Sequence, residues 1–199
     1  ANKSAASSER TFDAMHIRLD ADIANESDAK ALGVAVGDYV CFDPRYKELD
    51  GGYIKSHFLD NKAGCYVLLE IAKRLKDRPN KPPVELFFSV YEEVGHGGSS
   101  GFSETVKEML IVDMGVVGSD CQGNEQFCSI CAKDSSGPYD YFLRRHLEKL
   151  SLERSIACKT DVYPFYSSDG SMAWRAGYDV RIALIGPGVA ASHGMERTH

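Results

Sequence analysis

The sequence lacks long hydrophobic runs, basic clusters and an apolar leader, and each absence excludes a class of protein. No apolar stretch among the 199 residues approaches the length that spans a bilayer. The first residues, "ANKSAASSER", contain no signal-peptide core, so a cytoplasmic protein is the default expectation. The net charge of -6 is not offset by any basic cluster. We therefore expect neither a membrane nor a nucleic acid among the partners.

The six cysteines do not read as a disulfide framework, because a chain of this length without a secretion signal normally keeps its thiols reduced. Cys128 and Cys131 form one C-x-x-C pair. A structural zinc site needs four ligands, and in a strand these two side chains would point to opposite faces. We interpret them as packing residues.

The composition, 43% hydrophobic and 26% charged, is typical of a soluble globular protein. Hydrophobic periodicity predicts helices at 26–33, 61–78, 139–154 and 168–177. It predicts strands at 15–23, 38–49, 52–58, 84–90, 110–118, 125–134, 156–165 and 179–186. The "DGG" at residues 50–52 indicates a hairpin.

Strands and helices alternate from about residue 60 onward, which is typical of an α/β fold. We predict a mixed, mostly parallel sheet flanked by helices in residues 58–199, an incomplete catalytic domain. Residues 1–57 are predicted to form part of a small, β-rich, barrel-like lobe.

Polar residues follow several of the predicted strands, at the position where open α/β sheets place their sites. These residues are Asp60, Glu92, Glu93, Asp113, Asp169 and His193. Acids packed closely together repel one another unless a cation neutralises them. A cluster of carboxylates with one imidazole suits a divalent ion, and zinc, cobalt and manganese all fit.

Each residue also has a structural interpretation. Asp60 alone would more often be a helix N-cap, and His193 alone a surface histidine. Glu92 and Glu93 could be solvated loop acids. Asp113 is harder to dismiss, because an aspartate inside an apolar strand needs a partner. Only the combination favours a metal centre.

Four segments carry a resemblance to a known family: "FLDNKAGCYVLLE", "FFSVYEEVGHGG", "MLIVDMGVVG" and "SHGMERTH". In order and spacing they resemble the dinuclear metal aminopeptidases of the glutamyl and deblocking type, which include the tetrahedral aminopeptidases. The ending "ASHGMERTH" is most similar to a branch of peptidases from bacterial osmoprotectant gene clusters. The resemblance covers the chain from about Thr11 onward.

The resemblance implies a role for each candidate. Asp60 matches the aspartate that bridges two divalent ions, zinc or cobalt in the first place. Glu93 and His193 match ligands of one ion, and Asp113 a ligand of the other. Glu92 matches the general base that takes a proton from the attacking water and returns it to the leaving amine. Short peptides are the implied substrates, and a homo-oligomer, a dimer or a larger shell, is the implied assembly.

The sequence departs from the family in two places. It contains no His-x-Asp segment, which in the family supplies the other ion's histidine, so we expect a chain shortened at both ends. Where much of the family has Gly-Thr-Asp, this chain reads "YSSDGSMAW", with Asp169 in the aspartate's place. Asp169 and His96 are candidates for contact with the substrate.

Two other functions are compatible with parts of the sequence. A non-catalytic peptide-binding or assembly protein on the same scaffold, with an incomplete metal site, is consistent with the absent histidine segment. A glycosidase is weaker, because its two acids must flank a bond at about 5–9.5 Å, and adjacent Glu92 and Glu93 would leave one unused.

Overall fold

The computed structural model describes residues 2–199, and the chain forms two compact units, residues 1–41 and 42–199. The first unit contains α1 (Asn2–Ser7), a 3-10 turn (Phe12–Ala14) and α2 (Glu26–Ala31). Helix α2 begins at a capping box in which Asp28 N donates to Asn25 Oδ1 and Asn25 N donates to Asp28 Oδ2, both at 3.2 Å. The helix predicted before Gly33 is confirmed.

The strand predicted over residues 15–23 is wrong, since the described residues of the first unit contain no strand. The exposed fractions of Met15, Ile17 and Leu19 are 55%, 66% and 40%. Alternating hydrophobicity leads to a strand only where a neighbouring strand completes the hydrogen bonds and another layer covers the apolar face. Among the described residues, 15–23 pair with no strand.

The second unit is built on a six-stranded mixed sheet in the order β3-β8-β5-β6, with β4 paired to β8 and β7 to β5. The strands are β3 (Glu108–Val112), β4 (Gly115–Val116), β5 (Cys128–Asp134), β6 (Gly137–Pro138), β7 (Cys158–Val162) and β8 (Arg181–Val189). Strands β3 and β4 run parallel to β8, and β7 runs parallel to β5. The pairs β5–β8 and β5–β6 are antiparallel. The predicted mixed, mostly parallel sheet is confirmed.

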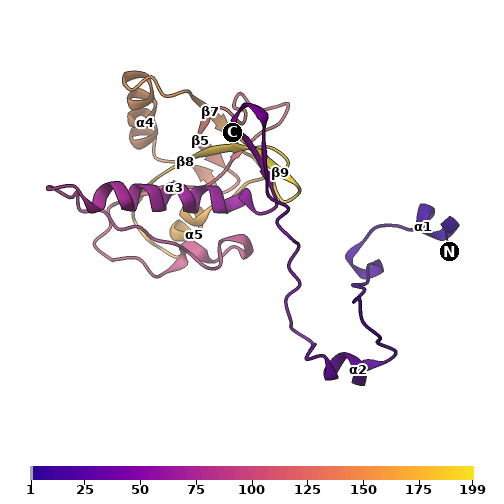
Figure 1. Ribbon diagram of the computed structural model, residues 1–199. Helices are drawn as coiled ribbons and strands as arrows, with labels where there is room; N and C mark the ends of the chain where they lie inside the picture. Colours follow the sequence, from indigo (N-terminus) through magenta and orange to yellow (C-terminus); the bar gives the residue numbers. More distant parts are fainter. Residues whose placement is uncertain (1) are drawn as a thin grey trace. The chain divides into compact units, whose positions relative to one another are not determined.

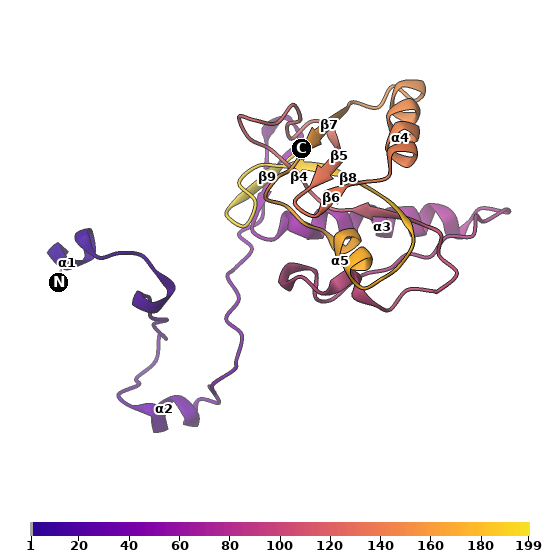
Figure 2. The same cartoon turned by 180° about the vertical axis from the view of Figure 1, so that it is seen from behind.

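Three helices flank this sheet: α3 (Leu59–Lys76), α4 (Tyr141–Glu153) and α5 (Asp169–Arg175) (Figure 1). Ile182 and Leu184 of β8 are buried together with Ala173 of α5, whereas Val189 is buried with Leu59 of α3. Because side chains alternate along a strand, α5 and α3 cover opposite faces of β8. Seen from behind, α3 again runs alongside the sheet (Figure 2).

Two further expectations concern membranes and cysteines. Among residues 2–199, no helix combines the length and the apolarity that a membrane span requires. All six cysteines are free. Cys131 is fully buried in the core, and Cys128 stands opposite Cys158 on the neighbouring parallel strand. Neither residue of the C-x-x-C pair joins a metal-binding group within the described part of the chain.

A second, antiparallel sheet consists of β1 (Lys47–Leu49), β2 (Tyr53–Ser56) and β9 (Glu196–Thr198), in the order β1-β2-β9. The predicted "DGG" hairpin is confirmed, and its Gly51 and Gly52 have φ of 74° and 83°, which glycine adopts readily. The strand predicted from residue 38 is confined to Lys47–Leu49. The predicted division into a lobe of residues 1–57 and a catalytic domain of residues 58–199 stays a prediction.

The strand predicted over residues 84–90 is wrong as well, because no described strand pairs with it. Val84, Phe88 and Val90 are 56%, 42% and 86% exposed. The run is apolar enough for a buried strand, but a strand exists only when a neighbour supplies its hydrogen bonds. It passes instead as irregular chain into the 3-10 turn Glu92–Val94.

Candidate metal centre

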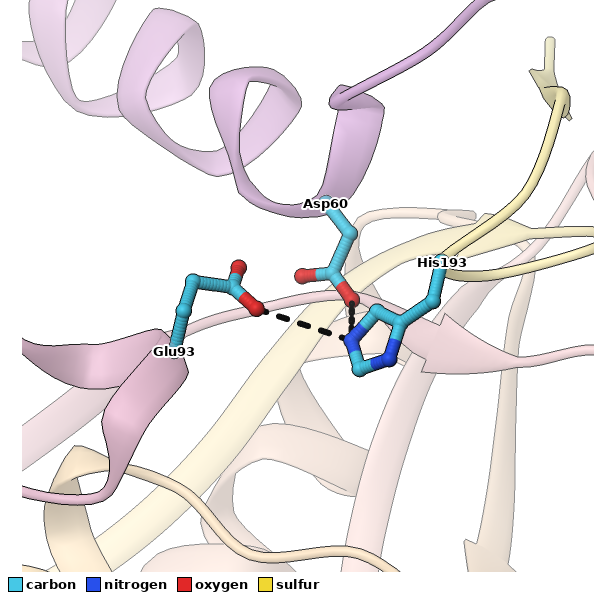
Figure 3. A group of neighbouring side chains, drawn as sticks. All are labelled: Asp60, Glu93 and His193. Carbon is cyan, nitrogen blue, oxygen red and sulfur yellow. Dashed lines mark ion pairs between the residues drawn. The ribbon is translucent and has the colours of Figure 1, made fainter. Parts of the chain in front are cut away.

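Asp60, Glu93 and His193 come from three distant parts of the sequence and meet at one point (Figure 3). One ligand atom from each lies within 4.8 Å of the others. His193 Nε2 is 3.3 Å from Asp60 Oδ2 and 3.5 Å from Glu93 Oε2. Asp60 lies in the first turn of α3, Glu93 in the turn Glu92–Val94, and His193 in the loop between β8 and β9. The structure thus brings together three of the four residues predicted as metal ligands.

At the start of α3 the backbone is arranged so that the Asp60 side chain points toward His193. The backbone at Asp60 and Asn61 is not helical, with ψ of 109° and 42°. Asn61 acts as the cap, because its Oδ1 accepts from Gly64 N at 3.1 Å. The Asp60 carboxylate instead accepts the Ser192 hydroxyl at 3.0 Å and faces His193. Asp60 is therefore not the N-cap of this helix.

Asn61 also connects the start of α3 to the end of β3. Its Nδ2 donates to Val112 O at 2.8 Å, one residue before Asp113. A Cβ on Gly64 would lie 2.3 Å from Asn61 Oδ1 and 2.6 Å from Val112 O, closer than any side chain allows. Gly64 thus permits the close approach that fixes Asp60 relative to Asp113.

Asp113 directly follows β3 and is only 4% exposed. It accepts a hydrogen bond from its neighbour Met114 N at 2.6 Å, and the Tyr166 hydroxyl bonds to it as well. Burial, with the nearby charge of Asp60 adding to it, raises the pKa of Asp113 to about 7. Asp113 therefore belongs to the electrostatic environment of the cluster, although it lies outside the group of three.

The acids destabilise one another's charged forms. Burial raises the pKa of Glu92 to about 8, and the charges of Asp113 and Asp169 contribute to that rise. Burial is also the main cause of the raised pKa of Asp60 and of Glu93, which the positive form of His193 partly counters. A divalent cation would relieve this repulsion, and carboxylates with one imidazole are donors that zinc, cobalt and manganese accept. The residues present therefore fit such a metal.

The two candidates for substrate contact are placed differently. Asp169, the first residue of α5, lies against the 3-10 turn Gly97–Ser99. A Cβ on Gly97 would be 2.3 Å from Asp169 Oδ1. Burial raises the pKa of Asp169, and hydrogen bonds from the Ser89 side chain and the Gly98 backbone partly counter that rise. His96 is exposed at the start of the turn Gly97–Ser99, and its side chain has no hydrogen bond, ion pair or ring contact within the described residues.

Sequence reasoning missed Glu196, which is 1% exposed and accepts hydrogen bonds from the backbone of Asp60 and of His193. Glu196 and Thr198 point inward and alternate with exposed residues of β9, but "ERTH" is polar throughout, so the sequence carries no hydrophobic pattern that would reveal this. Sequence reasoning also gives no role to Asn61, although it lies in "FLDNKAGCYVLLE", one of the segments that carry the family resemblance.

Solved structures similar to this chain are aminopeptidases. The aminopeptidase APDkam598 from the archaeon Desulfurococcus kamchatkensis matches with a TM-score of 0.79 and 21% identity, over 89% of this chain and 53% of that one. The TET1 peptidase of Pyrococcus horikoshii matches with a TM-score of 0.74 and 21% identity, over 94% of this chain and 61% of that one. At these identities the likeness establishes the fold.

Sequence comparison gives nearer relatives. The Bacillus subtilis (strain 168) protein named "Putative aminopeptidase YhfE" is 43% identical over 199 residues, 99% of this chain and 58% of its own length. An Acetivibrio thermocellus protein named "Putative aminopeptidase" is 30% identical over 78% of this chain and 49% of its own. The chain thus spans about half the length of these curated relatives. The model of the M42 glutamyl aminopeptidase family matches residues 2–199, and the chain belongs to that family.

Proposed function

We propose that the protein is a metal-dependent aminopeptidase that removes N-terminal residues from short peptides. The observation that carries this proposal is the convergence of Asp60, Glu93 and His193, with Glu92 adjoining Glu93 in the same turn. Family membership and the aminopeptidase names of the relatives support it.

We assign two divalent cations to this centre, zinc or cobalt in preference to manganese. Asp60, Glu93 and His193 would hold one, and Asp60 and Asp113 would contribute to the other. When bound, such cations polarise a peptide carbonyl and acidify a water molecule. Their positive charge would also stabilise the ionised forms of the acids, whose proximity and burial raise their pKa values.

Glu92 is the proposed general base. Its carboxyl is half-buried beside the ligands, and neutralising Asp113 and Glu93 would lower its raised pKa toward the range in which it accepts a proton. Glu92 would take the proton of the attacking water and deliver it to the leaving amine nitrogen. The charge of Asp169 acts on Glu92, which supports a place for Asp169 near the substrate, and His96 stays a prediction.

The proposal is tested by comparing Glu92→Gln with His193→Ala in the 199-residue chain. Glu92→Gln keeps the ligands, so the chain should retain its cobalt or zinc content while peptide hydrolysis falls by about 10²–10⁴-fold. His193→Ala removes a ligand and should lower the metal content itself. Metal content is measured by mass spectrometry after desalting, and turnover by release of free amino acid.

Glu85→Gln is the matched control. It makes the same chemical change in an exposed glutamate whose carboxylate accepts only from Ser103 N, at 3.3 Å, and it should alter neither quantity. Near-normal hydrolysis by Glu92→Gln would contradict the base assignment. Tight binding of two cations without any peptide cleavage by the unmodified chain would instead favour a non-catalytic peptide-binding protein.

We also propose that the protein self-associates. The Pyrococcus horikoshii relative is described as assembling into a tetrahedron or a large octahedral shell. Light scattering after size exclusion would give the mass of the species in solution. A dimer or larger multiple supports the proposal, and a concentration-independent monomer contradicts it.

A further inference from the structure

Glu196 is a buried acid that joins two of the three clustered residues by their backbones. Its Oε2 accepts from Asp60 N at 3.1 Å, and its Oε1 accepts from His193 N at 2.9 Å. Asp60 and His193, whose backbone N–H groups are the two donors, are 133 residues apart in the sequence. One carboxylate therefore links the start of α3 to the loop after β8.

The position of Glu196 is fixed by its strand. Within β9 it pairs with Ser56 of β2, and the next residue, Arg197, bridges to Ala190 at the end of β8. Thr198 donates to Gly188 O at 2.7 Å. Because contacts at three successive residues hold β9, the Glu196 carboxylate has little freedom to move. It can therefore fix the positions of the start of α3 and of the loop after β8 relative to each other.

The loop that Glu196 holds has an unfavourable backbone. Ala191 and His193 both have positive φ, 57° and 62°, a region that is unfavourable for a residue other than glycine. Such a conformation persists when the surroundings over-determine it. Two contacts do so here: Glu196 accepts from His193 N, and His57 Nδ1 donates to Gly194 O at 2.6 Å.

An ordinary packing role does not account for a carboxylate at this place. No lysine, arginine or histidine side chain forms an ion pair with Glu196 within the described residues, and its charge acts unfavourably on both Asp60 and Glu93. Burying an unpaired acid beside other acids is costly. What a carboxylate offers is two acceptor oxygens for two converging N–H groups, whereas a glutamine offers only one acceptor and places an NH₂ against the other donor.

We propose that Glu196 is a positioning residue that sets the spacing between Asp60 and His193 for a bound divalent cation. The proposal rests on the metal site of the proposed function. Glu196 is not one of the three clustered residues, and its effect would pass through the backbones of Asp60 and His193.

The test is a Co²⁺ titration of Glu196→Gln in the 199-residue chain, followed by calorimetry and by the cobalt absorption bands, with thermal unfolding of the metal-free protein measured in parallel. Loss of a residue that orients a ligand weakens metal binding by about 10–100-fold, and we expect a change in Kd of that size. The absorption bands should change as well, because the ligands no longer meet at the same geometry.

Glu125→Gln is the matched control, because Glu125 pairs with Arg197 of the same strand, at 2.6 Å, and contacts no proposed ligand. It should leave the Kd and the absorption bands unchanged. Glu196→Asp, which keeps the charge but shortens the reach, replaces Glu196→Gln if the latter does not fold, and should also weaken binding.

The outcomes separate two failures. A folded Glu196 variant with lowered thermal stability but an unchanged Kd and unchanged bands would overturn the positioning role and leave the metal site intact. An unmodified chain that binds no cobalt would overturn the metal site, and the positioning role with it.

Discussion

Asp113 and Asp134 are two buried aspartates at the ends of the strands that flank β8: Asp113 directly follows β3, and Asp134 is the last residue of β5. Their surroundings differ. Asp113 is 4% exposed and Asp134 is fully buried. Asp134 accepts from the backbone of Ser136 and Gly137 at 2.7 and 3.2 Å. It also accepts from the hydroxyls of Tyr139, at 2.9 Å, and Ser171. Four donors therefore surround one carboxylate.

Asp113 has fewer donors and acidic neighbours. Met114 N and the Tyr166 hydroxyl are its hydrogen-bond partners among the described residues, and the charges of Asp60 and Glu93 oppose its ionisation. A buried carboxylate ringed by donors is stable as an anion without a further partner. One that faces other acids, as Asp113 does, holds its proton up to about pH 7 unless a cation is bound. The comparison thus distinguishes a structural acid, Asp134, from an acid that we propose as a ligand, Asp113.

The largest expected effect comes from removing the structural acid. Asp134→Ala leaves several donors unpaired at about 1–3 kcal/mol each, of which rotation of the hydroxyls recovers part, so we expect a loss of about 3–5 kcal/mol in the free energy of unfolding. Urea unfolding of the metal-free chain at pH 7 measures it.

Asp113→Asn is the matched change in the other aspartate, and in the metal-free chain it should be neutral or stabilising, because it removes a buried charge that lacks a counterion. A loss as large as that of Asp134→Ala would show that the two acids have the same role.

A second effect is the pH dependence of the metal-free chain. The folded state raises the pKa of Asp113 to about 7 and that of Glu92 to about 8, so it binds protons that the unfolded chain releases. Their stabilising contribution is complete below the ordinary carboxyl pKa and is lost as the pH rises through 7 to 8. We expect Asp113 to contribute a loss of about 2–3 kcal/mol between pH 5 and pH 8. Glu92, which is partly in solvent, adds less.

Thermal unfolding in chelator at several pH values measures this dependence, and Asp113→Asn should flatten it. Asp134→Asn, if it folds, provides the comparison and should leave the slope in place. A metal-free chain that becomes more stable from pH 5 to pH 8 would contradict the raised pKa values.

Much of the fold follows from the sequence, because its signals are local. Helices α3 and α4 have apolar residues at helical spacing, and β8 is an apolar run that pairs with strands on both sides. The same reasoning fails for residues 15–23 and 84–90. Their apolar patterns are as good, but whether a run becomes a strand depends on a neighbour that its own residues do not specify.

The residues of the candidate site likewise fall into those that the sequence predicts and those that it does not. Asp60, Glu93 and His193 could be proposed because each follows a predicted strand, and Asp113 because it is an acid within an apolar one; both patterns are readable in sequence. Glu196 and Asn61 could not, because their roles consist of hydrogen bonds to the backbone of residues far along the chain. The chemistry of a ligand is visible in its side chain, whereas the support of a ligand depends on tertiary structure.

The smallest expected effect is the difference between two tyrosine substitutions, because Tyr139 bonds to Asp134 and Tyr166 bonds to Asp113. Tyr139 donates to Asp134 Oδ2 and lies 2.6 Å from Ser168 Oγ, so Tyr139→Phe should cost about 1.5–3 kcal/mol, typical of a hydrogen bond to a charged group. The Tyr166 hydroxyl is 3.2 Å from Met114 O and bonds to an acid that is protonated below pH 7 in the metal-free chain. Tyr166→Phe should therefore cost only about 0.5–1 kcal/mol at pH 5.

At pH 8 the loss for Tyr166→Phe should grow, because the ionised Asp113 then loses one of its few donors, while the loss for Tyr139→Phe should stay constant. Urea unfolding of both variants at the two pH values measures the difference. If the two tyrosines behave alike at both pH values, the donors around Asp113 and Asp134 are equivalent in energy. Acidic neighbours and burial alone would then have to account for the contrast between the two aspartates.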